Sequence, residues 1–145
     1  MPDAIELRGQ AMRLIDMPEW KRILWVDDHP ENNRGEIAAF ARLQIEVVTV
    51  TSTDDALAQL AESTDDPFAL VISDWQRQAE GPLAGLRLLR GMRGDGHTQP
   101  VIYYHGAFGS VPRTALAASA SAAGAFGEAT RPDELMRLVL SAMQV

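Results

Sequence analysis

From residue 22 onward the sequence alternates short apolar runs with longer amphipathic stretches, and this alternation restricts the possible folds more than any other feature. The apolar runs have few polar interruptions and several β-branched residues, which is typical of strands buried on both faces. Strands are predicted at 23–26, 45–50, 68–72, 101–104 and 125–127, and helices at 31–42, from Ser52 or Thr53 onward, and at 83–92, 112–122 and 132–143. Five strands alternating with five helices predict an α/β fold, with a doubly wound parallel sheet covered on both faces.

The composition excludes several classes of protein and site. The 145 residues include no cysteine, which rules out disulfides and thiolate metal sites. A formal net charge of −7 disfavours a nucleic-acid-binding surface, because such a surface needs clustered cations. No apolar run approaches the roughly 20 residues of a membrane span, and the N-terminus lacks the features of a signal peptide. We therefore expect a cytoplasmic protein that binds neither nucleic acid nor membrane.

The first residues stand apart from the alternating part of the chain. They predict an N-terminal helical extension, 1–20, followed by one main domain, 21–145. Within the extension a helix is predicted over 4–17, because four apolar side chains fall on one stripe before a proline. A helix of this length is too short for a stable two-stranded coiled coil, so packing on the domain or a weak homodimer is favoured.

Three aspartates follow the ends of two predicted strands. Asp27 and Asp28 end the first strand, and Asp74 follows the third. In a doubly wound sheet these strands are neighbours, and ligand sites lie beyond their carboxyl ends. Carboxylates that close repel one another, and Mg²⁺ relieves the repulsion because it prefers oxygen ligands. In the alternative interpretation, Asp27 and Asp28 only cap the next helix and Asp74 is a solvated loop residue.

The three aspartates suggest different roles. A carboxylate beside Mg²⁺ can attack phosphorus and form an aspartyl phosphate, while the metal neutralises the transferred group. Asp74 is the better candidate for the nucleophile because it stands alone after the central strand. Asp27 and Asp28 are the better candidates for holding the metal because they occur as a pair.

Five segments of this chain together resemble the receiver domain of two-component response regulators, most closely the stand-alone receivers of the chemotaxis type. The segments are ILWVDD at 23–28, VISDW at 71–75, GLRLLRGMR at 85–93, PVIYYHG at 100–106 and GAFGEATRP at 124–132. They occur in the family's order and extend over nearly the whole of 21–145. The resemblance implies a flavodoxin-like sheet with strand order 2-1-3-4-5.

The resemblance also implies a function. Asp74 would accept a phosphoryl group from a histidine kinase or phosphotransfer protein, and Asp27, Asp28, Asp74 and the backbone carbonyl of Gln76 would hold Mg²⁺. The protein would be a bacterial signalling receiver rather than a turnover enzyme, at most phosphorylating and dephosphorylating itself at Asp74. Because little sequence follows the last helix, we expect the output to be contact with a separate effector protein, through the last helix, the fifth strand and the fourth helix.

Three positions depart from the family pattern. His105 stands where receivers have a switch hydroxyl, Arg131 where they have a lysine that contacts the phosphoryl group, and Glu128 where they have a switch aromatic. Arginine can still pair with a phosphoryl group, although with a different geometry. We hypothesise that His105 and Glu128 interact and replace the usual switch pair. The loop after Asp74 is also longer than usual, with 78–80 as extra residues.

Two other functions fit parts of the sequence. A pseudo-receiver, acting as a phosphorylation-independent protein-binding module, is favoured by the departures and disfavoured by the intact aspartates. An aspartate-nucleophile phosphatase would need a DxD pattern after the first strand, whereas this chain has Asp27-Asp28-His29. His29 could reach a metal or be simply solvated, and Trp75 could report on Asp74 or only pack at the rim of the site.

Overall fold

The computed structural model describes residues 4, 8–9, 21–75, 80–81, 83–104 and 124–143. The predicted helix over 112–122 lies outside these residues, as does most of the predicted helix over 4–17. The strands are β1 (Lys21–Val26), β2 (Ile45–Val50), β3 (Leu70–Ser73), β4 (Val101–Tyr104) and β5 (Gly127–Ala129). The helices are η1 (Pro30–Asn33, a 3-10 helix), α2 (Arg34–Arg42), α3 (Thr53–Glu62), α4 (Ala84–Gly94) and α6 (Pro132–Ala142).

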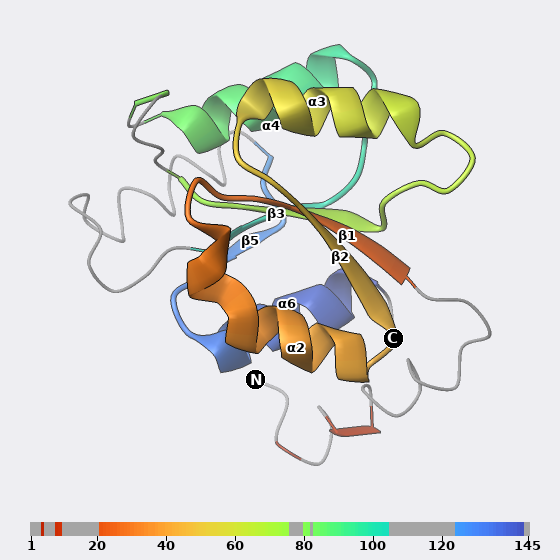
Figure 1. Ribbon diagram of the computed structural model, residues 1–145, viewed down its shortest axis with the longest axis vertical. Helices are drawn as coiled ribbons and strands as arrows, with labels where there is room; N and C mark the ends of the chain where they lie inside the picture. The colour runs from red at the N-terminus through yellow and green to blue at the C-terminus, as the bar shows by residue number, and fades with distance from the viewer. Residues whose placement is uncertain are drawn as a thin grey trace.

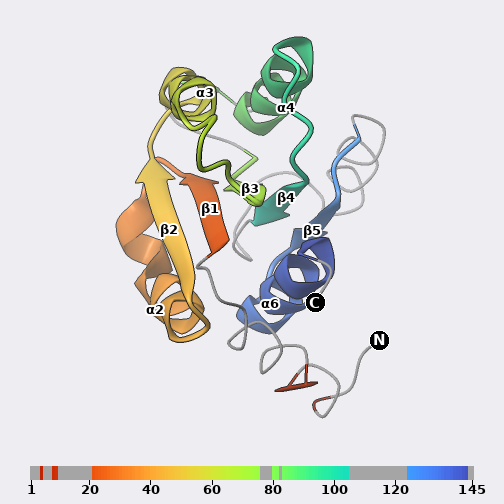
Figure 2. The same cartoon turned by 90° about the vertical axis from the view of Figure 1, so that its right-hand side faces the viewer.

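The strands form one parallel five-stranded sheet in the order β2-β1-β3-β4-β5, as predicted. Helices α3 and α4 cover one face, and α2 and α6 cover the other (Figures 1 and 2). Parallel pairing brings all carboxyl ends to one edge of the sheet, with β1 between β2 and β3. In the described part of the chain no helix is both long and apolar enough to span a membrane.

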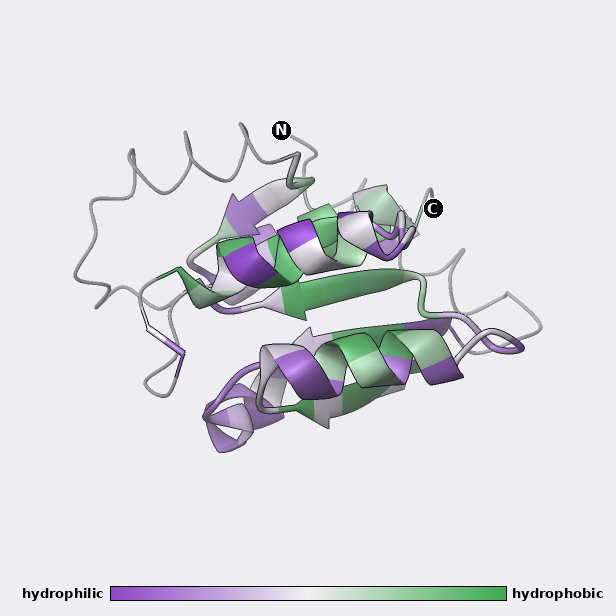
Figure 3. Cartoon of the chain, turned by 90° about the horizontal axis from the view of Figure 1, so that it is seen from above, coloured by the Kyte–Doolittle hydropathy of each residue, from purple (hydrophilic) through white to green (hydrophobic). Residues whose placement is uncertain are grey.

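The central strand β1 supplies side chains to two separate cores. Leu24 and Val26 point into the core beneath α3 and α4, whereas Ile23 and Trp25 point into the core beneath α2 and α6. All four side chains are fully buried, which explains why this run carries no polar alternation. Figure 3 shows the same arrangement, with apolar strands between helices whose outer faces are polar.

The first residues of α3 and α6 explain where these two helices begin. The Ser52 hydroxyl accepts a hydrogen bond from the Asp55 N–H at 3.1 Å, so Ser52 rather than Thr53 is the N-cap of α3. The acidic residues of its first turn also suit the positive end of the helix dipole. Helix α6 begins at Pro132, a position where the missing N–H costs nothing.

Two strand boundaries differ from the prediction. β3 occupies Leu70–Ser73 rather than 68–72, because Phe68 is buried without belonging to the strand. Its ring packs beneath the Arg22 guanidinium, 4.4 Å from the ring centroid. An aromatic residue buried at the entry to a strand has the same sequence signature as one inside it.

β5 is Gly127–Ala129 rather than 125–127. The prediction followed the apolar Ala125 and Phe126, but Phe126 is exposed, and its N–H donates to the Val101 carbonyl at 2.8 Å before the ladder begins. Glu128 therefore lies in the middle of β5, opposite Tyr103 in the parallel register, rather than after the strand.

Gly85, in the first turn of α4, allows that helix to approach the end of β3. Its N–H donates to the Trp75 carbonyl at 2.9 Å, and its carbonyl accepts from the Tyr103 hydroxyl at 2.7 Å. A Cβ at this position would lie 2.6 Å from the Asp74 carbonyl oxygen and 2.8 Å from a ring carbon of Tyr103. No side chain fits there without moving the backbone that carries Asp74.

We predict that Gly85→Ala lowers the free energy of unfolding by roughly 1–3 kcal/mol or more, because the new methyl group overlaps rigid backbone. Gly94→Ala, in the same helix, is the matched control, since a Cβ there meets no atom within 4 Å. The control is expected to raise stability by up to about 1 kcal/mol through better helix propensity. Urea unfolding of both variants measures the difference, and equal effects would contradict the close approach at Gly85.

Candidate metal and phosphoacceptor site

The predicted carboxylates meet at the carboxyl edge of the sheet. The register pairs Val26 of β1 with Ser73 of β3, so the residues that follow both strands are neighbours. One carboxylate oxygen from each of Asp27, Asp28 and Asp74 lies within 4.8 Å of the other two. Asp74 is buried, and the other two aspartates are half-buried at the rim. The structure thus brings together the three residues that the sequence analysis selected.

Asp27 is held in place by the turn that follows it. Its Oδ1 accepts the His29 N–H at 2.8 Å, and its Oδ2 accepts the Asn33 side-chain amide at 3.0 Å. The first bond goes to His29, the residue before η1, and neither η1 nor α2 receives a side-chain cap, so Asp27 holds this turn rather than capping a helix. Asn33 is a buried polar residue that the sequence analysis missed, because an asparagine near a helix start also has an ordinary capping interpretation.

The backbone of Asp74 continues the β3 ladder. Its N–H donates to the Val26 carbonyl at 3.1 Å, and its carbonyl accepts from the Ser73 hydroxyl at 2.7 Å. These bonds mean that the sheet, rather than a loop, sets the position of the Asp74 carboxylate. Trp75 follows directly, with only 4% of its surface exposed. Its ring packs edge-on against Tyr103 with centroids 4.9 Å apart, so Trp75 is a core residue rather than a rim residue.

The donor set fits a hard divalent cation. All three side chains offer carboxylate oxygens, which Mg²⁺ and similar ions prefer over nitrogen or sulfur ligands. The half-exposed ring of His29 lies beside this group, with Nε2 4.0 Å from Asp28 Oδ2 and Nδ1 3.4 Å from Glu31 Oε1. Gln76, whose carbonyl was expected to complete the metal shell, lies outside the described residues.

The predicted relay residues are only partly described. His105 lies outside the described residues, so its pairing with Glu128 stays a prediction. Arg131 is exposed at the start of α6, where its Nε lies 3.3 Å from Asp133 Oδ1 and 3.3 Å from Glu134 Oε1. The residue expected to meet a phosphoryl group is thus engaged by two carboxylates of the next helix.

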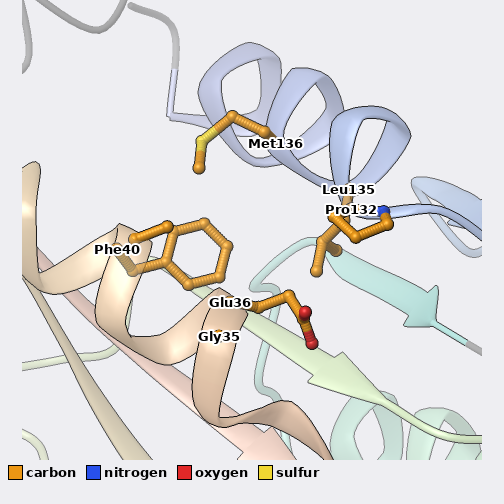
Figure 4. A pocket seen from close by; sticks show the side chains of 7 residues that line it. Gly35, Glu36, Phe40, Pro132, Leu135 and Met136 are labelled. Carbon is orange, nitrogen blue, oxygen red and sulfur yellow. The ribbon is translucent and has the colours of Figure 1, made fainter.

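A small hollow of about 90 Å³ lies between α2 and α6 (Figure 4). Its walls are mainly apolar, and its lining residues are Gly35, Glu36, Ala39, Phe40, Pro132, Leu135 and Met136. Both helices contribute their first turns, and these follow Asp28 and Arg131 closely in the chain. The hollow therefore opens near the edge of the sheet that carries the aspartates.

Two ionisable groups near this hollow have shifted pKa values. Burial raises the pKa of Glu36, and a hydrogen bond to its backbone offsets part of the rise. Burial also raises the pKa of Tyr104, and the negative charges of Glu36 and Asp133 raise it further. The Tyr104 ring packs edge-on against Trp25, with centroids 5.8 Å apart. The phenol therefore stays neutral to a higher pH than an exposed tyrosine.

The comparisons with known proteins identify the fold. A receiver domain from Clostridium thermocellum matches with a TM-score of 0.70 at 21% identity, over 86% of this chain and 94% of that one. The chemotaxis response regulator CheY4 of Vibrio cholerae matches with a TM-score of 0.67 at 19% identity, over 85% and 98% of the two chains. A receiver protein from Burkholderia phymatum matches at 0.69 and 23%, over 86% and 96%. No family model and no curated protein sequence matches the chain.

The chain therefore has the receiver fold of two-component response regulators, a five-stranded parallel sheet with strand order 2-1-3-4-5. This confirms the resemblance on which the sequence analysis relied. At such identities the likeness establishes the fold alone.

We predict that Glu36→Gln lowers the pKa of Tyr104, because one of the negative charges that oppose its ionisation is removed. The pKa should stay above the ordinary value near 10, since burial remains the larger cause. Absorbance titration of tyrosinate measures the shift, and Tyr104→Phe assigns the transition. Glu62→Gln, on α3 across the sheet, is the control and should leave the midpoint unchanged.

The same raised pKa has a consequence for stability. An unfolded tyrosine ionises near pH 10, whereas Tyr104 in the folded protein ionises only at higher pH. The unfolded state therefore loses its proton first, and stability should fall as the pH rises above about 10. Tyr104→Phe should reduce this fall in urea unfolding at pH 9 to 11, and an unchanged slope would contradict the assignment.

Proposed function

We propose that this chain acts as the receiver of a response regulator in a two-component phosphorelay. Residues 21–145 form the receiver, preceded by the extension 1–20. Asp74 accepts a phosphoryl group from a histidine kinase or phosphotransfer protein in the cytoplasm, and the phosphorylated state is passed to an effector protein by surface contact. The observation that carries this proposal is the group of three carboxylates, Asp27, Asp28 and Asp74, at the carboxyl ends of neighbouring strands in a receiver fold.

Each residue of the group has a defined task in phosphoryl transfer. An oxygen of Asp74 attacks phosphorus in line with the departing imidazole nitrogen of the donor, so that a P–O bond forms as the P–N bond breaks. The hydrogen bond from the Asp74 N–H to the Val26 carbonyl fixes the backbone that carries this carboxylate. Asp27 and Asp28, with the Gln76 carbonyl and Asp74 itself, would hold Mg²⁺. When bound, Mg²⁺ supplies positive charge against the transferred group.

The cation of Arg131 is the remaining candidate for contact with the phosphoryl group. It now pairs with Asp133 and Glu134, both in the first turn of α6. A dianionic phosphoryl group on Asp74 would compete with these carboxylates for the guanidinium, which suits bidentate pairing with phosphate. His105 is proposed to occupy the place of the family's switch hydroxyl.

The hollow between α2 and α6 supports a protein donor. A donor that brings phosphohistidine to Asp74 must contact the elements around the carboxyl edge of the sheet, and the first turns of α2 and α6 lie there. Pro132 and Met136 give the hollow an apolar rim above the buried Phe40 and Leu135, with the carboxylate of Glu36 in its wall (Figure 4). Such a hollow suits an apolar side chain flanked by a basic residue of the partner.

A pseudo-receiver remains the second candidate, because Arg131 is already paired and Glu128 replaces an aromatic residue. This protein would keep the fold and bind partners without accepting phosphate. The two functions differ in whether Asp74 becomes modified and whether Mg²⁺ binds beside it.

We predict that Mg²⁺ with beryllofluoride changes the emission of Trp75, because the buried indole follows the acceptor directly. Acetyl phosphate with Mg²⁺ should add the mass of one phosphoryl group, and Asp74→Asn should abolish both responses. Asp28→Asn should weaken Mg²⁺ binding by about tenfold or more, since it removes a charged ligand. Emission titration and intact-mass spectrometry measure these effects.

Asp65→Asn removes an exposed carboxylate from a loop and serves as the control, with no expected change in either assay. Trp75→Phe should remove the emission change while leaving phosphorylation intact. A flat Mg²⁺ titration together with an unmodified mass would exclude phosphoacceptor function and favour the pseudo-receiver.

A further inference from the structure

Glu80 connects the loop after Asp74 to the start of α3. Its Oε1 accepts the Thr53 N–H at 2.8 Å, and its Oε2 accepts the Thr53 hydroxyl. The two residues are far apart in the sequence, and only 15% of the Glu80 side chain is exposed. In the sequence, Glu80 is expected only as one of the extra residues of this loop.

The position suits a carboxylate for a general reason. The first N–H groups of a helix have no partner within the helix and create a partial positive charge. Ser52 satisfies the N–H of Asp55, and Glu80 satisfies that of Thr53, which is buried at the first position of α3. The Glu80 carboxylate also lies 3.9 Å from the Arg87 guanidinium on α4. It thus links the two helices that lie side by side on this face (Figure 1).

The start of α4, which follows Glu80, is also hydrogen-bonded to the residue after the acceptor Asp74. Gly85 donates to the Trp75 carbonyl, and Tyr103 donates to the Gly85 carbonyl. Gly85 is therefore bonded to the residue after Asp74, and Glu80, five residues earlier in the chain than Gly85, is bonded to α3.

We propose that Glu80 is a positioning residue of the Asp74 site, which attaches the chain entering α4 to the start of α3 and so prepares the site for Mg²⁺. The proposal rests on the proposed function, because it assumes that the three carboxylates bind the metal. A site already held in its binding geometry gives up less conformational freedom on binding and therefore binds more tightly. The coupling is reciprocal, so Mg²⁺ should in turn strengthen the link between Glu80 and Thr53.

The test titrates Mg²⁺ alone against the full chain, with Trp75 emission and calorimetry as readouts. Glu80→Ala should weaken Mg²⁺ binding by roughly tenfold, the scale seen when a group supporting a metal ligand is lost. Glu80→Gln keeps one oxygen acceptor and should lie between Glu80→Ala and the wild type. Thr53→Val removes only the hydroxyl and should weaken binding by a smaller factor.

The double variant separates positioning from simple loss of charge. Thr53→Val should have no further effect in the Glu80→Ala background, because both changes break the same link. Asp55→Asn removes a charge from the same helix turn without touching Glu80, and should change Mg²⁺ affinity less than twofold. Urea unfolding confirms that every variant is folded.

A second readout is hydrogen exchange at the Thr53 amide. Mg²⁺ should slow this exchange in the wild type and leave it unchanged in Glu80→Ala. Wild-type affinity in Glu80→Ala, or additive effects in the double variant, would overturn the role of Glu80 while the proposed function stands. Failure of the wild type itself to bind Mg²⁺ would overturn both.

Discussion

The parallel pairing of β1 with β3 is the constraint on which the rest of the structure depends. Its register sets Val26 opposite Ser73 and so brings the carboxylates after the two strands within 4.8 Å of one another. Burial of both strands on both faces makes this register costly to change, because a shift of one residue would turn every core side chain to the wrong face. The stability of the sheet therefore holds together a group of charges that repel one another in the absence of a cation.

The sequence predicted the parts of the site that depend on strand ends. Asp27, Asp28 and Asp74 could be placed together because strands in a parallel sheet end at one edge, and short, nearly uninterrupted apolar runs located the strands. Boundaries were less certain where a buried aromatic residue, Phe68, precedes its strand and where β5 is only three residues long. In both cases an apolar residue lies outside the hydrogen-bonded strand, and an apolar pattern in the sequence predicts burial rather than strand pairing.

The contacts that hold the site were not predictable in the same way. Asn33 supports Asp27, and Glu80 supports the start of α3, through side chains whose partners depend on three-dimensional proximity. An exposed arginine such as Arg131 has several carboxylates within reach, and nothing in the spacing selects Asp133 and Glu134. Residue type and spacing identify which side chains can bind a metal or react. The side chains that hold them in place come from distant parts of the sequence and become visible only in the folded structure.

The division of the interior into two cores has a practical consequence. Trp25 lies in one core, packed edge-on against Phe40 and Tyr104, and Trp75 lies in the other, packed edge-on against Tyr103. Each side of the sheet therefore carries its own indole in a distinct aromatic environment. Variants that lack Trp20 and retain either Trp25 or Trp75 would report separately on the α2–α6 half and the α3–α4 half. They would show whether the halves of this molecule loosen together or one before the other.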